Sequence, residues 1–122
     1  MNINRFEDTI AWQLAEKLTT EIYKLEFKTQ FGLDFGLKDQ IQRASVSIMS
    51  NIAEGFERGS DKEFIKFLYI AKGSCGEVRS LLHVAYDLKY INQTTYKRLI
   101  SDCEEISKTI TGLIKYLSNS NN

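Results

Sequence analysis

Apolar residues recur at intervals of three and four along almost the whole chain, and no proline interrupts them. This spacing places side chains on one face of an α-helix, because a helix turns by about 100° per residue. A proline inside a helix removes a backbone donor and clashes with the preceding turn. Its absence from all 122 residues therefore permits long helices throughout. No strand-like alternation competes with this period, so the pattern predicts an all-α chain.

Glycines and short polar stretches divide this pattern into four segments. We predict helices over residues 7–28, 37–58, 61–89 and 93–117, with residues 119–122 as a frayed tail. Gly32 and Gly36 mark the first loop, and Gly59 marks the second. Short loops favour antiparallel neighbours, so we expect an antiparallel up-down four-helix bundle that forms one domain over residues 1–122.

Three helix starts carry residues that cap a helix. Asn4 with Glu7, and Ser60 with Glu63, have the spacing of a capping box, in which two side chains satisfy free backbone donors. Asn92 has the residue type of an N-cap before the last segment.

Each segment has one apolar stripe that we assign to the core. The stripe of the first segment contains Ile10, Leu14, Leu18, Ile22 and Leu25. The stripes of the other segments contain Leu37, Ile41, Ala44, Ile48 and Ile52; Phe64, Leu68, Ala71, Cys75, Val78, Leu82 and Ala85; and Tyr96, Leu99, Cys103, Ile106, Ile110, Leu113 and Leu117. The two cysteines fall within these stripes, so we interpret them as small buried apolar residues and not as a disulfide.

The second segment has a second apolar face, about a quarter turn from the first. It contains Val46, Met49, Ala53 and Phe56. The third segment has a similar excess near Gly73, at Ile70, Leu81, Val84 and Leu88. One bundle-facing stripe needs only about 100° of the helix surface. These faces therefore predict the interface of a homo-oligomer, with scattered exposed apolar groups as the alternative.

A polar stripe also runs along the second segment. It contains Gln40, Arg43, Ser47, Asn51, Glu54 and Arg58. It is either a solvated face or a hydrogen-bonded seam between helices or subunits. The seam would explain why Asn51 and Ser47, which are unfavourable in a helix interior, lie in the middle of this segment. Gly55 and Gly73 each cost about 1 kcal/mol against alanine in a helix, which the close approach of another backbone would offset.

The sequence lacks the residue patterns of common metal-binding, phosphate-binding and acid–base catalytic sites. The chain has one histidine, His83, and no paired Cys or His spacing that would hold zinc or a di-iron centre. Gly32 and Gly36 lack the following lysine of a phosphate-binding loop, and the adjacent Glu104 and Glu105 point to different sides of a helix. We therefore expect no enzyme activity, no metal, no cofactor and no small-molecule substrate. No apolar stretch suits a signal peptide or a membrane span, so we expect a cytoplasmic protein.

Residues 40–55, QIQRASVSIMSNIAEG, resemble the four-helix-bundle proteins named after the 23S ribosomal RNA intervening sequence. The matching positions there are Gln40, Arg43, Ser47, Asn51, Glu54 and Gly55. The resemblance continues at Phe6 and Trp12, and in the third segment at Phe64, Phe67, Leu68, Ala71, Gly73, Ser74 and Glu77. It covers about residues 5–117.

The resemblance implies an antiparallel bundle that assembles into ring-shaped homopentamers, with no enzyme activity. Some members are encoded within insertions in ribosomal RNA genes, and the family is similar to nucleic-acid-binding accessory proteins of diversity-generating retroelements. Two features depart from the family pattern. Residues 27–29 stand where members often carry a proline, and the chain has 16 basic and 16 acidic residues, whereas the nucleic-acid-binding relatives are more basic.

Two hypotheses follow for function. In the first, the ring binds structured RNA or a ribonucleoprotein through Arg43, Arg58, Lys62 and Lys66, placed around the second loop. The net charge of zero then predicts weak, salt-dependent binding through a local patch. In the second, the chain is a protein–protein scaffold without a nucleic-acid role.

Overall fold

A computed structural model describes residues 3–25 and 33–120 of the chain. The described part contains a short 3₁₀-helix, η1, and four α-helices. Their bounds are η1 Phe6–Asp8, α1 Ile10–Tyr23, α2 Phe35–Glu57, α3 Asp61–Asp87 and α4 Gln93–Ser120. The all-helical fold predicted from the sequence is confirmed.

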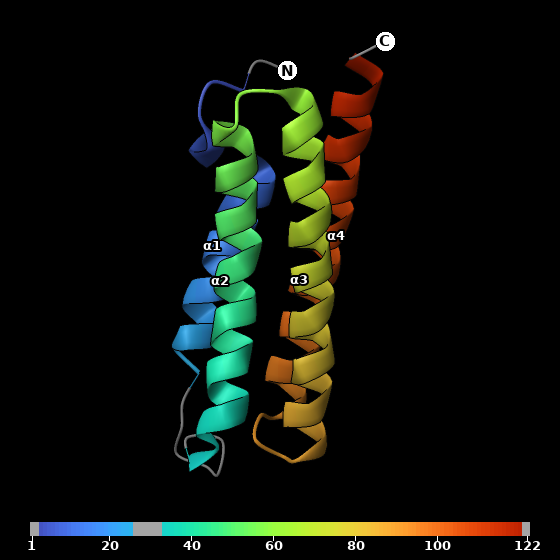
Figure 1. The fold of residues 1–122 in the computed structure, drawn as a ribbon. Helices are drawn as coiled ribbons and strands as arrows, with labels where there is room; N and C mark the ends of the chain where they lie inside the picture. Colours follow the sequence, from blue (N-terminus) through green and yellow to red (C-terminus); the bar gives the residue numbers. More distant parts are fainter. Residues whose placement is uncertain (1–2, 26–32, 121–122) are drawn as a thin grey trace.

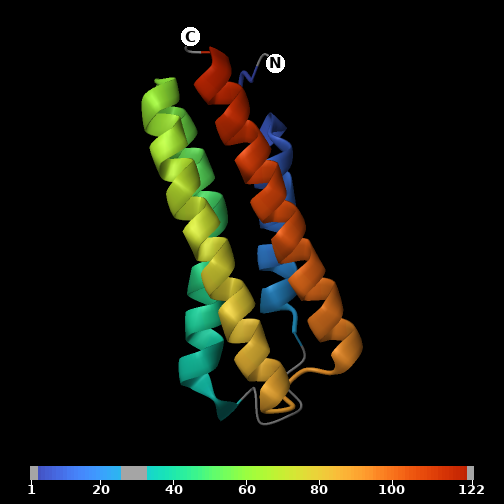
Figure 2. The same cartoon turned by 90° about the vertical axis from the view of Figure 1, so that its right-hand side faces the viewer.

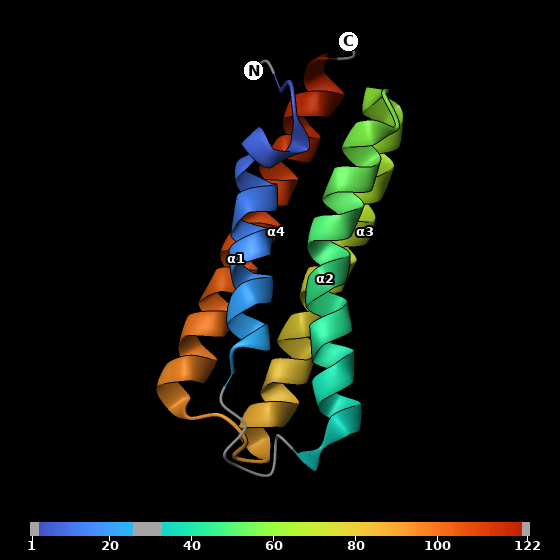
Figure 3. The same ribbon diagram turned by 90° about the vertical axis from the view of Figure 1, so that its left-hand side faces the viewer.

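The four helices run side by side in alternating directions (Figure 1). Helix α1 packs beside α2, α2 beside α3, α3 beside α4, and α4 returns to α1. The two views turned by 90° show α3 and α4 along one side of the bundle and α1 and α2 along the other (Figures 2 and 3). Both ends of the chain lie at the end of the bundle where α2 turns into α3. This arrangement is the predicted antiparallel up-down bundle, and no helix in the described ranges is long and apolar enough to cross a lipid bilayer.

Two helix starts differ from the prediction because other side chains satisfy the free backbone donors. Thr9, not Asn4, caps α1 by accepting a hydrogen bond from the Trp12 backbone N–H at 3.2 Å. Residues 6–8 form η1 before it, so the predicted Asn4–Glu7 capping box is wrong. Asp34 caps α2 through the Leu37 N–H at 3.1 Å, which places Gly36 inside the first turn and not in a loop.

Ser60 and Asn92 cap α3 and α4 as predicted, by accepting from the N–H groups of Glu63 and Thr95. The Glu63 carboxylate lies 4.0 Å from Arg58 instead of completing its capping box.

The helix ends also differ. Helix α1 ends at Tyr23, so residues 24 and 25 are not part of it, and the rest of the predicted segment, residues 26–28, lies outside the described residues. Helix α3 ends at Asp87, and Lys89 just after it has a left-handed backbone with φ 63°. Helix α4 continues to Ser120, so residues 118–120 are helical; residues 121 and 122 lie outside the described range.

The predicted stripes of α2, α3 and α4 form the core except for Leu37 and Tyr96, which are half-buried. In α1, Leu18 and Ile22 are buried as predicted, but small residues complete the inward face. The buried residues of α1 are Ala11, Ala15, Leu18, Thr19 and Ile22, whereas Ile10 is 60% exposed and Leu14 is half-buried. The Thr19 hydroxyl tolerates burial because it donates to the carbonyl oxygens of Ala15 and Ser45, at 2.8 and 3.1 Å. The predicted α1 stripe counted large apolar residues, while the core of the bundle accepts small ones that let α1 approach α2.

Gly55 lies at a close approach between α2 and α3. A Cβ atom added there would lie 2.6 Å from the Cβ of Phe67 and 3.4 Å from the carbonyl oxygen of Phe64. Glycine is therefore required for this approach, which agrees with the expectation from the sequence. At Gly73 no atom lies within 4 Å of such a Cβ, so the same expectation is not met there within the subunit.

We expect Gly55→Ala to lower the free energy of unfolding by about 1–3 kcal/mol, because the added methyl group would force α2 and α3 apart. The matched control is Gly76→Ala in α3, where the methyl group meets open space. That variant should gain up to about 1 kcal/mol from helix propensity. Chemical denaturation of both variants measures the difference, and equal stabilities would contradict the close approach.

Candidate functional site

Part of the polar stripe of α2 faces α3 and forms hydrogen bonds with it. The hydroxyls of Ser47 and Ser74 lie 2.9 Å apart across the two helices. The Asn51 amide donates to the carbonyl and hydroxyl oxygens of Ser47, at 2.8 and 3.0 Å. Gln40 reaches Glu77 at 3.5 Å. The structure therefore places Gln40, Ser47 and Asn51 in or beside an interhelix seam, while Arg43, Glu54 and Arg58 are exposed, so both arrangements that the sequence left open are present.

The second apolar face of α2 is partly covered within the subunit. Val46, Met49, Ala53 and Phe56 are all half-buried. Met49 and Phe56 pack against the core, and the Phe56 ring meets Phe64 edge-on with centroids 5.8 Å apart. Because α1, η1 and α3 flank this helix, the bundle buries more of α2 than one stripe.

Several exposed apolar residues lie instead on α3 and at its C-cap. Ile70, Val84 and Leu88 are 45%, 43% and 49% exposed, while Leu81 is half-buried and packs against the core. Steps of fourteen and four residues return to nearly the same side of a helix, so Ile70, Val84 and the C-cap residue Leu88 share one outer face of α3.

The four basic residues proposed from the sequence do not form one patch. Arg43 lies fifteen residues from Arg58 on α2, or about 22 Å along the helix, so it is far from the second loop. It pairs with Asp39 at 2.9 Å. Arg58 pairs with Glu54 at 3.0 Å, and its guanidinium lies 4.9 Å from the centroid of the Phe67 ring. Only Lys62 and Lys66 remain there as exposed cations without an ion pair among the described residues.

A different basic site lies in a groove lined by residues of α3 and α4. These two helices are in front in Figure 2. The groove has a volume of about 450 Å³. Four cations line it, Lys72 and Arg79 from α3 and Lys108 and Lys115 from α4, together with Glu104, Ser107, Thr111 and Gly112. We call this surface the basic groove. None of its four cations has an ion-pair partner within 4.0 Å in the part of the chain that the structure describes.

The sequence contains a signal for this groove that the apolar and polar stripes do not include. Lys72 and Arg79 are seven residues apart, as are Lys108 and Lys115. Seven residues make almost two full turns, so each pair shares a helix face. Only the packing of α3 against α4 shows that the two faces meet.

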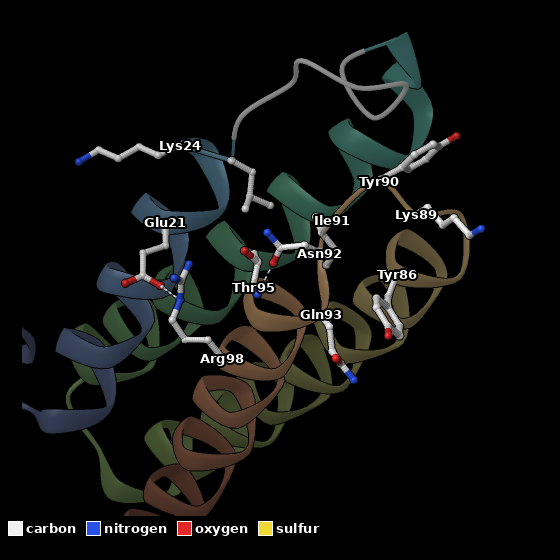
Figure 4. Close-up of a pocket in the computed structure, with 11 residues that line it drawn as sticks. Glu21, Lys24, Tyr86, Lys89, Tyr90, Ile91, Asn92, Gln93, Thr95 and Arg98 are labelled. Atoms are coloured by element: carbon white, nitrogen blue, oxygen red, sulfur yellow. Dashed lines mark hydrogen bonds and ion pairs between the residues drawn. The ribbon is translucent and has the colours of Figure 1, made fainter.

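A second hollow lies at the end of the bundle, between α1 and the α3–α4 turn (Figure 4). It has a volume of about 820 Å³, and we call it the end cleft. It is lined by Glu21, Lys24, Leu25, Tyr86, Lys89, Tyr90, Ile91, Asn92, Gln93, Thr95 and Arg98. The Tyr90 hydroxyl donates to Asp34 at 3.0 Å, which ties the turn to the start of α2 and raises the pKa of Tyr90.

A half-buried acidic group, Asp102, lies on α4 and interacts with charged residues of α1. Burial raises the pKa of Asp102, and the negative charge of Glu21 raises it further, while Lys17 and Arg98 oppose the shift. Glu21 itself pairs with Arg98 at 3.8 Å.

The two cysteines meet across α3 and α4 as free, buried thiols. The Cys75 thiol donates to the Cys103 carbonyl oxygen at 3.1 Å. Contact with Cys75 and burial raise the pKa of Cys103, which keeps that thiol protonated. Within the described residues, no group of three or more His, Cys, Asp and Glu side chains is placed to hold a metal ion. His83 instead contacts Tyr96, with its Nδ1 atom 2.8 Å from the tyrosine oxygen.

This four-helix bundle matches a known protein family. The family profile described as 23S rRNA-intervening sequence protein matches residues 7–112. The chain belongs to the 23S rRNA-intervening sequence protein family. A crystal structure of a protein of unknown function from the S23 ribosomal protein family of Bacteroides thetaiotaomicron is similar, with a TM-score of 0.80 and 27% sequence identity. The match covers 87% of this chain and 96% of that one. No protein with a curated description matches.

Membership of the 23S rRNA-intervening sequence protein family confirms the resemblance drawn from the α2 and α3 motifs. In this member, most of those motif residues lie at the contact between α2 and α3. Gly55 allows the helices to approach, while Ser47, Asn51 and Ser74 bond across or along the seam. Glu54 pairs with Arg58, and Phe6 packs edge-on against Trp12 at 5.2 Å. The basic groove lies on the opposite side of α3 from this seam.

We expect Asn51→Ala to lower the free energy of unfolding by about 1–3 kcal/mol, because the Ser47 acceptors lose their half-buried donor. Thermal melting measures the change, and Asn119→Ala on the exposed end of α4 is the control. An unchanged melting temperature would show that the seam contributes little to stability.

We also expect Asp102→Asn to stabilise the protein at neutral pH. A carboxyl group whose pKa is raised on folding opposes folding once it ionises, because the unfolded chain ionises first. The destabilisation is absent below the ordinary aspartate pKa of 3.8 and develops as the pH rises through the raised folded value. The variant should therefore melt higher than wild type at pH 7 and lose this advantage near pH 3. The reverse order at pH 7 would contradict the assignment.

Proposed function

We propose that this chain is a non-enzymatic, ring-forming module that binds structured RNA through the basic groove. The supporting observation is the convergence of Lys72, Arg79, Lys108 and Lys115 on one groove without ion-pair partners in the described chain. Unpaired cations attract phosphates because binding releases the counterions condensed on the RNA. The family description names 23S rRNA, which makes RNA the partner class that fits best.

The net charge of zero is the main argument against RNA binding, but the basic groove is locally positive. Several acidic residues are engaged elsewhere, since Asp39 pairs with Arg43 and Glu54 pairs with Arg58. Within the groove, four basic residues face one acidic residue, Glu104. The local field is thus positive while the sum over the chain is zero.

We propose that the exposed face of α3, with Ile70, Val84 and Leu88, forms the contact between subunits. Open space at Gly73 beside this face leaves room for a neighbouring helix to approach. A homopentamer is the favoured state, as the family resemblance implies. In a ring, each subunit repeats the basic groove, so weak contacts to one long RNA add up through avidity.

The same apolar face of α3 also supports a second candidate, a protein–protein scaffold without a nucleic-acid role. The two candidates differ in what the groove does, so RNA retention at low salt separates them.

For RNA binding, we compare two double variants that change the charge equally. Lys108→Glu with Lys115→Glu reverses the α4 side of the basic groove, and Lys62→Glu with Lys66→Glu reverses two exposed lysines near the second loop. The groove variant should lose RNA binding and flatten the log–log salt dependence by about 0.7–0.9 per lost phosphate contact. The loop variant should bind like wild type.

Filter retention of 23S rRNA fragments at low and moderate salt measures both effects. Loss in the loop variant alone would move the site to Lys62 and Lys66. If wild type retains no RNA at low salt, the scaffold candidate replaces the RNA role.

For assembly, we expect Ile70→Glu with Val84→Glu to produce monomers, because a charge buried in an interface without a partner is costly. The control is Ile10→Glu on α1, a residue that is 60% exposed and lies away from this face. Multi-angle light scattering reports the mass of each variant. A wild-type mass of only 14.1 kDa at micromolar concentration would contradict the proposed ring.

A further inference from the structure

An aromatic cluster lies on α3 and α4 near their connecting turn. The rings of Tyr86 on α3 and Tyr96 on α4 stack almost in parallel, with centroids 4.2 Å apart and an interplanar angle of 8°. The His83 ring meets Tyr96 edge-on at 5.4 Å, and the two side chains share the hydrogen bond between Nδ1 and the tyrosine oxygen. Both tyrosines are half-buried and His83 is exposed. We call these three residues the aromatic platform.

The aromatic platform continues the basic groove along the same pair of helices. Arg79 of the groove and His83 of the platform are four residues apart on α3, or about 6 Å along the helix axis. Residues four apart lie on one side of a helix, so no other turn of α3 separates the cations from the rings. A chain of phosphates held by the groove therefore passes within reach of the platform.

The outer side of the platform opens into the end cleft. Tyr86 lines this cleft together with Lys89 and Gln93, and Figure 4 shows its ring in the region between these two side chains. The exposed Gln93 amide carries donors and an acceptor that suit the edge of a nucleobase. Lys89 adds a cation beside the ring, and the cleft volume of about 820 Å³ leaves room for a base and its sugar.

We infer that the aromatic platform stacks an unpaired base of the RNA whose backbone lies in the basic groove, so that the protein prefers single-stranded segments over duplex. This inference rests on the proposed function and adds the recognised form of the RNA. A groove of cations that leads to aromatic rings is the arrangement that holds single strands, since bases stack on the rings while lysines follow the backbone. In a duplex the bases are already stacked and paired, which leaves only phosphates for the groove.

The test compares wild type with Tyr86→Leu, which keeps apolar volume but removes the ring, and with Tyr86→Phe, which keeps the ring. The probes are a fluorescent oligouridylate and a blunt RNA duplex of the same strand length, measured by anisotropy at one salt concentration. Loss of one stacked base should weaken oligouridylate binding by about fivefold to 150-fold in Tyr86→Leu. Duplex binding should be unchanged in this variant, and Tyr86→Phe should match wild type with both probes.

A second measurement does not depend on how the variants fold. An oligouridylate with one 2-aminopurine should lose fluorescence when wild type binds it, because stacking on an aromatic ring quenches this base. Equal affinity of Tyr86→Leu and wild type for oligouridylate, or an equal loss for both probes, would overturn the platform while leaving the groove in place. Binding without quenching would overturn it as well. Wild type that binds neither probe at low salt would instead overturn the proposed function and the platform with it.

Discussion

The close contact between α2 and α3 determines how the rest of the bundle is arranged. Gly55 lets the backbone of α2 approach Phe64 and Phe67, and the hydroxyls of Ser47 and Ser74 meet farther along the same contact. Glycine and serine residues lie at this contact beside the apolar core, so the backbones of α2 and α3 can approach closely. Because one side of α3 packs against α2, its other sides face α4 and the solvent.

Helix α3, packed against α2 on one side, therefore has two different outer surfaces. Ile70, Val84 and Leu88 are exposed on one of them, and Lys72 and Arg79 join α4 on the other. The proposed assembly uses the first surface, and the proposed RNA contact uses the second. The two roles do not compete for the same side chains, so a ring of subunits would leave every groove open to the RNA.

The distribution of ion pairs explains how a chain with no net charge has a positive groove. Arginines on α2 have acidic partners one turn away, at Asp39 for Arg43 and at Glu54 for Arg58. Lys108 and Lys115 on α4 have no such partner in the described chain, although Glu104 lies one turn before Lys108. The pattern of neighbours, and not the number of charges, therefore sets the local field.

The sequence alone determined the helices and most of the core, because the helical period and the capping residues Ser60 and Asn92 act locally. It also indicated the α2–α3 contact through the glycine and serines of the family motif. It missed part of the core face of α1, where the buried Thr19 hydroxyl bonds to Ala15 and to Ser45 on another helix. The basic groove needed the tertiary structure for the same reason. Each pair of basic residues can be recognised in the sequence of one helix, but which two helix faces meet is decided by packing between residues far apart in the chain.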